Sequence, residues 1–137
     1  MKEGYKYDIG ISYASEQREY VKSLESSLKK QGIKSFIDYK EPERLWGEYI
    51  PEELRKIYSK ECKMILVIIS KEYTEKNYTK FESRIACERE LSGESLLIIK
   101  MGDFTLPWLN STYGYLESSK YTTDEIAGFI KKKQTRI

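Results

Sequence analysis

Short apolar segments alternate with amphipathic segments along most of this 137-residue sequence. The apolar segments span 7–12, 33–38, 64–69 and 96–99, and a shorter one lies at 113–116. Between them, apolar residues recur at helical spacing. Such alternation is typical of parallel strands that are each followed by a helix.

This alternation predicts a specific topology. Sequential strand–helix units close right-handed and cover both faces of a parallel sheet. We therefore predict an α/β fold of the flavodoxin-like, doubly wound kind, with a parallel five-stranded sheet in the order 2-1-3-4-5 and helices on both faces. Eight residues are expected to be largely buried: Ile9, Ile11, Phe36, Ile65, Val67, Ile68, Leu97 and Ile98.

Several local signals support this topology. Gly32 ends the first helix, and Pro51 lies in the first turn of a helix that precedes the segment 64–69. The segment Thr122–Glu125 fits a capping box at the start of a last helix. The polar stretch Tyr39–Gly47 is expected to be a long loop, because Pro42 discourages regular structure there.

Composition limits the partners and the location. With 24 basic and 22 acidic residues, the net charge of +2 does not favour nucleic acid or an anionic membrane. The two cysteines, Cys62 and Cys87, form no CxxC motif and no metal cluster with histidine, so we expect reduced thiols and no metal. The amino terminus has no apolar signal core, and segment 64–69 is too short to span a bilayer. We expect residues 1–137 to be one cytoplasmic domain.

The chain contains no histidine, which restricts its chemistry. Nucleophiles paired with histidine and imidazole metal sites are excluded. A hydride-carrying dinucleotide domain would need G-x-G-x-x-G after the first strand, where 12–17 reads SYASEQ. A phospho-receiver would need an aspartate at the end of the third strand, where Ser70 stands. Any catalysis must therefore use carboxylates.

Glu82 is the carboxylate in the most informative position. It lies in an amphipathic segment after the apolar strand 64–69, four residues after Tyr78. At helical spacing, the ring and the acid share one face near the carboxyl end of that strand, where ligands bind in open α/β sheets. The pair Thr79 and Glu82 also fits a capping box, in which both side chains satisfy backbone N–H groups. The two interpretations are compatible.

Five segments of the sequence, in order, resemble the Toll/interleukin receptor (TIR) domain family. Residues 7–15, YDIGISYAS, resemble its opening strand. Residues 36–38 and 45–48 are similar to its second strand and variable BB loop, residues 68–73 to its third strand, and residues 106–116 to a late segment. The resemblance covers nearly the whole chain and is strongest to the bacterial branch.

The resemblance implies a function. Enzymatic TIR domains cleave the nicotinamide–ribose bond of NAD+, and they carry a glutamate on the helix after the third strand. Glu82 matches that catalytic glutamate, and Tyr78 stands where the family usually has tryptophan. The implied activity is an NAD+ nucleosidase that uses NAD+ as substrate and needs no cofactor. Its product would be ADP-ribose or a cyclic ADP-ribose, in bacterial antiphage defence, where that product reaches a downstream effector.

Further substrate-binding residues are expected at the carboxyl edge of the sheet. They are Ser12, Tyr13, Ala14 and Ser15 after the first strand, Asp38 after the second, and Trp46 in the loop. Three of them have a structural alternative, since Ser15 suits an N-cap, Asp38 the cap of a turn, and Trp46 a loop anchor. We also expect self-association through Tyr39–Gly47. The alternative function is a non-catalytic module that signals by TIR–TIR contacts.

Overall fold

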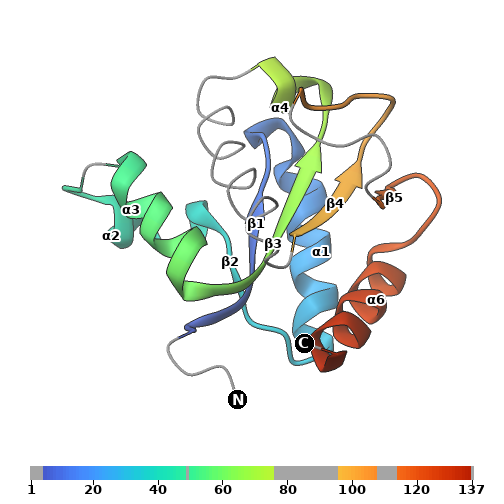
Figure 1. Ribbon diagram of the computed structural model, residues 1–137, viewed down its shortest axis with the longest axis horizontal. Helices are drawn as coiled ribbons and strands as arrows, with labels where there is room; N and C mark the ends of the chain where they lie inside the picture. Colours follow the sequence, from blue (N-terminus) through green and yellow to red (C-terminus); the bar gives the residue numbers. More distant parts are fainter. Residues whose placement is uncertain (1–4, 49, 76–95, 108–113, 137) are drawn as a thin grey trace.

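A computed structural model describes residues 5–48, 50–75, 96–107 and 114–136 (Figure 1). Strands and helices alternate along the chain as predicted. The strands are β1 (Tyr7–Ser12), β2 (Ser35–Phe36), β3 (Cys62–Ile69), β4 (Leu96–Lys100) and β5 (Leu116–Glu117). The α-helices are α1 (Arg18–Lys30), α2 (Pro42–Leu45), α3 (Ile50–Lys56), α4 (Lys71–Glu75) and α6 (Thr123–Arg136). The described residues also form two 3-10 turns, η1 (Ser15–Gln17) and η2 (Asp38–Lys40), and a π-helical turn, η3 (Ile57–Glu61).

The five strands form one parallel sheet in the order β2-β1-β3-β4-β5, which confirms the predicted topology. The long strand β3 lies at the centre, where Leu66 pairs with Ile11 on one side and with Leu97 on the other. Its apolar sequence follows from this place, because a central parallel strand is covered on both faces.

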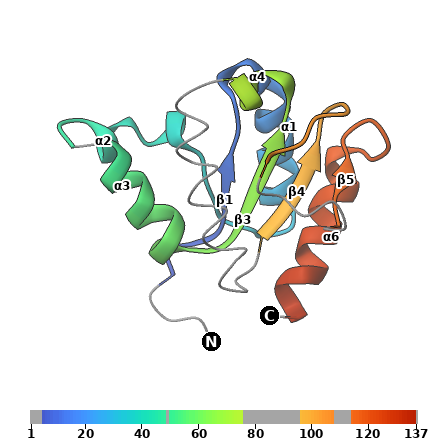
Figure 2. The same ribbon diagram turned by 45° about the horizontal axis from the view of Figure 1, so that its top comes forward.

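Helices cover the two faces of the sheet separately (Figures 1 and 2). Helices α1 and α6 pack on one face through Val21, Leu24 and Ile130, which join a cluster with Ile11 and Leu66. Helix α3 and the turn η3 pack on the opposite face, where Leu54 and Tyr58 join a second cluster. The described residues thus form two core clusters, one on each face of the sheet.

The core prediction is confirmed for all but one residue. Leu97 is only partly buried, because it lies on β4 next to the short strand β5. The other predicted core residues are buried: Ile9, Ile11, Phe36, Ile65, Val67, Ile68 and Ile98.

The predicted end of α1 and the predicted start of α6 are also confirmed. Gly32 follows α1 with a φ of 73°, a conformation that glycine adopts without strain. At the start of α6, the Glu125 N–H donates to Thr122 Oγ1 at 3.1 Å, and the Thr122 N–H donates to Glu125 Oε1 at 2.9 Å. This reciprocal pair is the predicted capping box.

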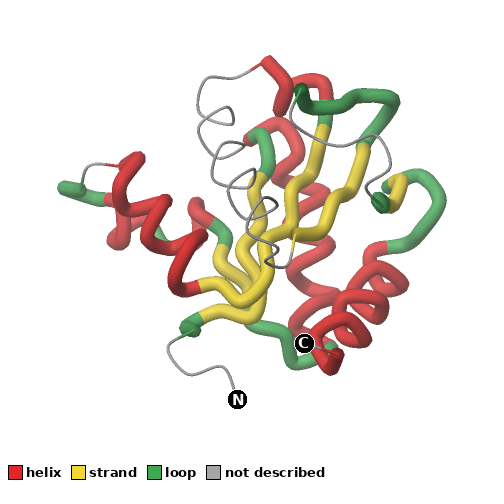
Figure 3. Tube along the Cα trace, in the orientation of Figure 1, coloured by secondary structure: helices red, strands yellow, loops and turns green. Residues whose placement is uncertain are grey.

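Three expected elements differ in the structure (Figure 3). The second strand pairs only over Ser35–Phe36, since the backbone turns into η2 directly after Ile37. The stretch Tyr39–Gly47 is not an irregular loop, because it contains α2. Pro42 begins that helix, where its missing N–H costs nothing. The last strand is Leu116–Glu117, displaced toward the carboxyl terminus from the segment expected at 113–116.

Candidate functional site

The carboxyl ends of β1, β3 and β4 meet at the edge of the sheet where α4 begins, at the top of Figure 1. Parallel strands place their carboxyl ends at one edge, and ligands bind there in open α/β folds. The candidate site is built on this edge from side chains of β1, η1, η2 and α4.

Ser12, the last residue of β1, is tied to α4. Its Oγ lies 2.8 Å from the hydroxyl of Tyr73. Ser12 is 2% exposed and Tyr73 is 1% exposed, so this hydroxyl pair is buried. A buried hydroxyl without a partner is costly, and the pair satisfies both groups. Ser12 therefore acts inside the wall of the edge and does not present a free surface to a ligand.

A second link joins the turn after β1 to α4. Ser70 Oγ donates to Gln17 Oε1 at 2.7 Å and accepts the Tyr73 N–H at 3.1 Å, so Ser70 caps the start of α4. Gln17 Nε2 donates to Glu72 Oε1 at 3.1 Å. Gln17 thus connects the turn after β1 to both the cap and the first turn of α4. The structure fixes the exits of β1 and β3 relative to each other.

Tyr13 and Asp38 are brought together as expected from their places at the ends of β1 and β2. The Tyr13 hydroxyl donates to Asp38 Oδ1 at 3.1 Å. Burial raises the pKa of Tyr13 far above its ordinary value, and the Asp38 carboxylate adds to this, while Arg18 acts in the opposite direction. Tyr13 is 5% exposed, so its ring lies in the wall of the edge and its hydroxyl holds the Asp38 carboxylate.

The next two expected residues differ from each other. Ala14 is 1% exposed, and its carbonyl accepts the N–H of Gln17 at 2.9 Å. Ser15 begins η1 on the exposed surface, with a long 3.4 Å contact to Glu16. The structure thus places Ala14 in the wall of the edge and Ser15 at its rim.

Trp46 is 86% exposed, so its ring does not pack on the sheet edge. It follows α2 directly and precedes Gly47, whose φ of 81° turns the chain. Trp46 is therefore displayed outward and does not anchor the loop. Tyr78 and Glu82 lie outside the described residues.

Sequence reasoning missed Gln17, Ser70, Glu72 and Tyr73 as parts of this edge. One signal was available: a serine after a buried strand and just before a helix is typical of an N-cap. The pairing partners gave no local signal, because Ser12 and Tyr73 are 61 residues apart.

No described helix is long and apolar enough to cross a membrane. Within the described ranges, no three side chains among His, Cys, Asp and Glu are grouped as a metal site would require.

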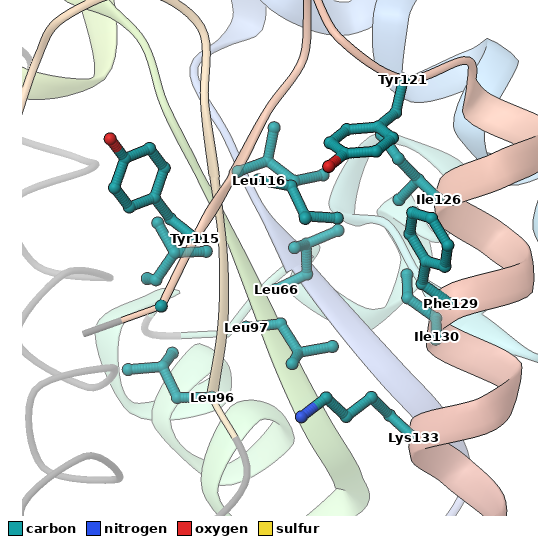
Figure 4. A pocket seen from close by; sticks show the side chains of 13 residues that line it. Leu66, Leu96, Leu97, Tyr115, Leu116, Tyr121, Ile126, Phe129, Ile130 and Lys133 are labelled. Carbon is teal, nitrogen blue, oxygen red and sulfur yellow. The ribbon is translucent and has the colours of Figure 1, made fainter. Parts of the chain in front are cut away.

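An apolar groove lies between β4, β5 and α6 (Figure 4). It has a volume of about 610 Å³ and is lined by Leu97, Leu116, Phe129 and Lys133, among others. The Lys133 side chain reaches toward the groove from α6. Tyr115 is 45% exposed at its other wall and carries the Lys100 ammonium 4.1 Å above its ring. This surface is apolar with two cationic groups at its margin.

Comparison with known proteins identifies the family. The TIR domain family model matches residues 9–132. The chain is 34% identical over 131 residues to the 3′ cyclic ADP-D-ribose synthase AaTIR of Aquimarina amphilecti. That alignment covers 94% of this chain and 40% of the relative, so the chain spans less than half of that protein's length.

Solved structures share the fold at low identity. The TIR domain of the Toll-related receptor TRR-2 from Hydra magnipapillata has a TM-score of 0.72 at 20% identity, with 96% of this chain and 97% of that chain covered. A TIR-STING receptor from C. gigas, solved with 2′,3′-cGAMP, has a TM-score of 0.70 at 19% identity, with 96% and 41% covered. The family model and the relative in sequence together show that the chain belongs to the TIR domain family.

Proposed function

We propose that this TIR domain is an NAD+ nucleosidase that cleaves the bond between nicotinamide and ribose. The observation that carries the proposal is the 34% identity to a 3′ cyclic ADP-D-ribose synthase over nearly the whole chain. The fold adds a suitable place for a nucleotide, the carboxyl edge of a doubly wound sheet.

The chemistry suits a chain without histidine. When the C1′–N bond breaks, its electron pair stays on the pyridinium nitrogen, and nicotinamide leaves as a neutral ring without a general acid. The ribose becomes oxocarbenium-like, and a nearby carboxylate stabilises that positive charge. We assign this role to Glu82, which also suits hydrogen bonding to a ribose hydroxyl.

Two products are possible by the same first step. Water that attacks C1′ and loses a proton gives ADP-ribose. A cyclic product forms when a hydroxyl oxygen of the same nucleotide bonds to C1′ and loses its proton, or when a ring nitrogen bonds to C1′ through its lone pair. The similarity to a 3′ cyclic ADP-D-ribose synthase favours a cyclic ADP-ribose here. In our proposal, Asp38 contacts the substrate at the sheet edge, and the buried Tyr13 holds Asp38 from within the wall. Ser15 and Tyr78 border the substrate, and Ser12 and Ala14 complete the wall.

We also propose that the domain self-associates head to tail through the Tyr39–Gly47 segment. Trp46 is exposed beside Glu43 and Glu48, which are exposed as well. The groove between β4, β5 and α6 is apolar and is lined by Lys133, and the Lys100 ammonium lies over the ring of Tyr115, another lining residue. The two surfaces are complementary in charge and polarity, and they lie on opposite sides of the molecule (Figures 1 and 2). Trp46 of one copy would therefore enter the groove of another copy.

A biological role follows from the reaction. The resemblance to bacterial members supports antiphage defence, with the nucleotide product acting on a downstream effector in the cytoplasm. Phage challenge of cells that express the wild type or Glu82→Gln tests this role, and equal protection by both would contradict it.

The enzymatic proposal is tested by incubating concentrated protein with NAD+ and measuring nicotinamide and nucleotide products by chromatography. Glu82→Gln should abolish nicotinamide release at an unchanged thermal midpoint, because it keeps the side-chain shape and removes the charge. Glu75→Gln, an exposed change in α4, is the matched control and should retain activity. If Glu82 only caps a helix, its substitution lowers the midpoint and leaves nicotinamide release intact.

The second candidate is a non-catalytic interaction module, and the exposed Trp46 favours it. The two candidates separate cleanly. An assembled wild-type protein that leaves NAD+ intact supports the module, whereas turnover that depends on Glu82 supports the enzyme.

A further inference from the structure

Helix α2 needs support from outside itself, because it has only four residues. An isolated helix of this length is not stable in water. Its support comes from Arg44, whose guanidinium reaches three elements of the fold. Trp46 follows only two residues later, so whatever holds α2 also holds the exposed ring in place.

The Arg44 contacts form a fork. Nη1 donates to Glu61 Oε1 at 3.0 Å and Nη2 to Glu61 Oε2 at 3.2 Å, a two-point pairing with fixed geometry. Nη2 also donates to Glu53 Oε2 at 2.9 Å. The side chains of Arg44, Glu53 and Glu61 are 19%, 16% and 7% exposed. This cluster is thus largely removed from water.

The other end of α2 is fastened to the same cluster. The Tyr7 hydroxyl donates to both carboxylate oxygens of Glu41, at 2.9 and 3.1 Å, and accepts from Arg44 Nη1 at 3.2 Å. Leu45 packs against the core on the α3 face of the sheet. The hydrogen bonds that Arg44 donates to Glu61 are the main cause that raises the pKa of Arg44, so the guanidinium stays charged.

The backbone on both sides of the exposed Trp46 ring is also hydrogen-bonded. The Trp46 N–H donates to the Pro42 carbonyl at 3.0 Å, and the Glu48 N–H donates to the Leu45 carbonyl at 3.1 Å. With Leu45 turned into the core and α2 fixed by Arg44, Trp46 is left facing outward. A buried ion cluster is weak as a source of stability alone, since apolar residues of similar volume often serve as well. The Arg44 contacts instead fix the orientation of α2, and with it the direction in which Trp46 faces.

We propose that Arg44 is a positioning residue for self-association, which holds α2 so that Trp46 is presented to a second copy of the chain before contact. This inference rests on the association proposed above. Preorganisation strengthens binding, because the segment need not be ordered when the complex forms.

The first test measures the anchoring directly. Amide hydrogen exchange of Trp46 and Glu48 should be faster by about tenfold or more in Glu53→Gln and in Arg44→Gln than in the wild type. Glu53→Gln is the gentler variant, because it leaves the Glu61 fork intact. It decides the question if Arg44→Gln does not fold. Lys22→Gln, which removes an exposed ion pair on α1, is the control and should leave the exchange unchanged.

The second test is a double-mutant cycle on association, measured by analytical ultracentrifugation over a range of protein concentrations. We expect Trp46→Ala and Glu53→Gln each to weaken association several-fold, and Glu53→Gln to add almost nothing in the Trp46→Ala background. If Glu53 acted on association independently of Trp46, the effects of the two substitutions on the free energy of association would instead add.

The outcomes of these tests distinguish the positioning role of Arg44 from the proposed self-association through Trp46. If Trp46→Ala leaves association unchanged, the proposed route of association fails and the role of Arg44 fails with it. If Trp46→Ala weakens association while Glu53→Gln changes neither exchange nor association, association through Trp46 stands and the positioning role is refuted.

Discussion

The hydroxyl groups of Ser12 and Tyr73 lie 2.8 Å apart and join the end of β1 to α4 across 61 residues of sequence. With the bridge from Gln17 to Ser70 and Glu72, this contact couples two exits of the sheet. Both links lie at the edge where we place NAD+. These contacts therefore hold the ends of β1 and β3 in place relative to each other.

We expect Tyr73→Phe to lower the free energy of unfolding by about 1–2 kcal/mol, because it leaves the buried Ser12 hydroxyl without this partner. Urea denaturation of Tyr73→Phe, Ser12→Ala and the double variant measures the coupling. The double variant should cost less than the sum of the two single changes. Additive costs would show that the hydroxyl pair is not an energetic unit.

Gln17→Leu should separate the turn after β1 from α4 while leaving the cap that Ser70 provides. Since Gln17 is only half-buried, we expect a small loss of stability, on the order of 0.5–1 kcal/mol. Catalytic efficiency on NAD+ should fall more than this loss explains, mainly through a higher KM. Initial rates of nicotinamide release measure it. An unchanged KM would mean that the bridge does not position the substrate edge.

Tyr7 gives the fold a dependence on alkaline pH. Burial raises its pKa from 10.0 to about 12, and the hydrogen bond to Glu41 and the charge of Glu41 add to this effect. The unfolded chain loses this proton more easily than the folded chain. The contribution of Tyr7 to stability is therefore complete below pH 10 and is lost as the pH rises to about 12.

Tyr7→Phe has no such proton to lose. Its free energy of unfolding should be lower than that of the wild type below pH 10, and the difference should shrink as the pH approaches about 12. Urea denaturation of both proteins across this range provides the measurement, in which the titration of lysines cancels. A constant difference would contradict the assignment.

Gly10 and Gly128 should respond in opposite directions to alanine. A Cβ at Gly10 would lie 2.7 Å from Cys62 Sγ and 3.0 Å from the Tyr58 ring, so Gly10→Ala should destabilise the fold by about 1–3 kcal/mol. At Gly128, in α6, no atom lies within 4 Å of such a Cβ. Gly128→Ala should stabilise by about 0.5–1 kcal/mol, because alanine is the better helix former. The midpoints of urea unfolding of the two variants and the wild type provide the measurement. If both substitutions shifted the midpoint in the same direction, the packing argument would be refuted.

The sequence was sufficient for the topology because its signals are local. The run Met64–Ile69 marks a strand that is covered on both faces, and Thr122 with Glu125 marks the first turn of α6. Connection handedness then sets the strand order. The length of β2 was not predictable in this way, because pairing at the edge of a sheet depends on its one neighbour, β1.

The site was predictable in part for the same reason. Tyr13 and Asp38 follow two strands that are neighbours in the sheet, so topology alone brings them close. The Arg44 fork depends on contacts with Glu53 and Glu61, and no spacing rule connects residues nine and 17 positions apart across a turn. Such clusters arise from packing in three dimensions.

The opposite placement of Trp46 and the groove has a consequence for how an assembly could be stopped. A contact between two different surfaces does not close on itself, so an open assembly has an unoccupied Trp46 at one end and an unoccupied groove at the other. A variant that keeps the groove but lacks the indole ring, such as Trp46→Ala, would bind the free Trp46 at one end of the assembly. It would present no ring to a further copy. Such a variant would therefore stop growth at that end and shorten the assemblies even when wild-type chains are in large excess.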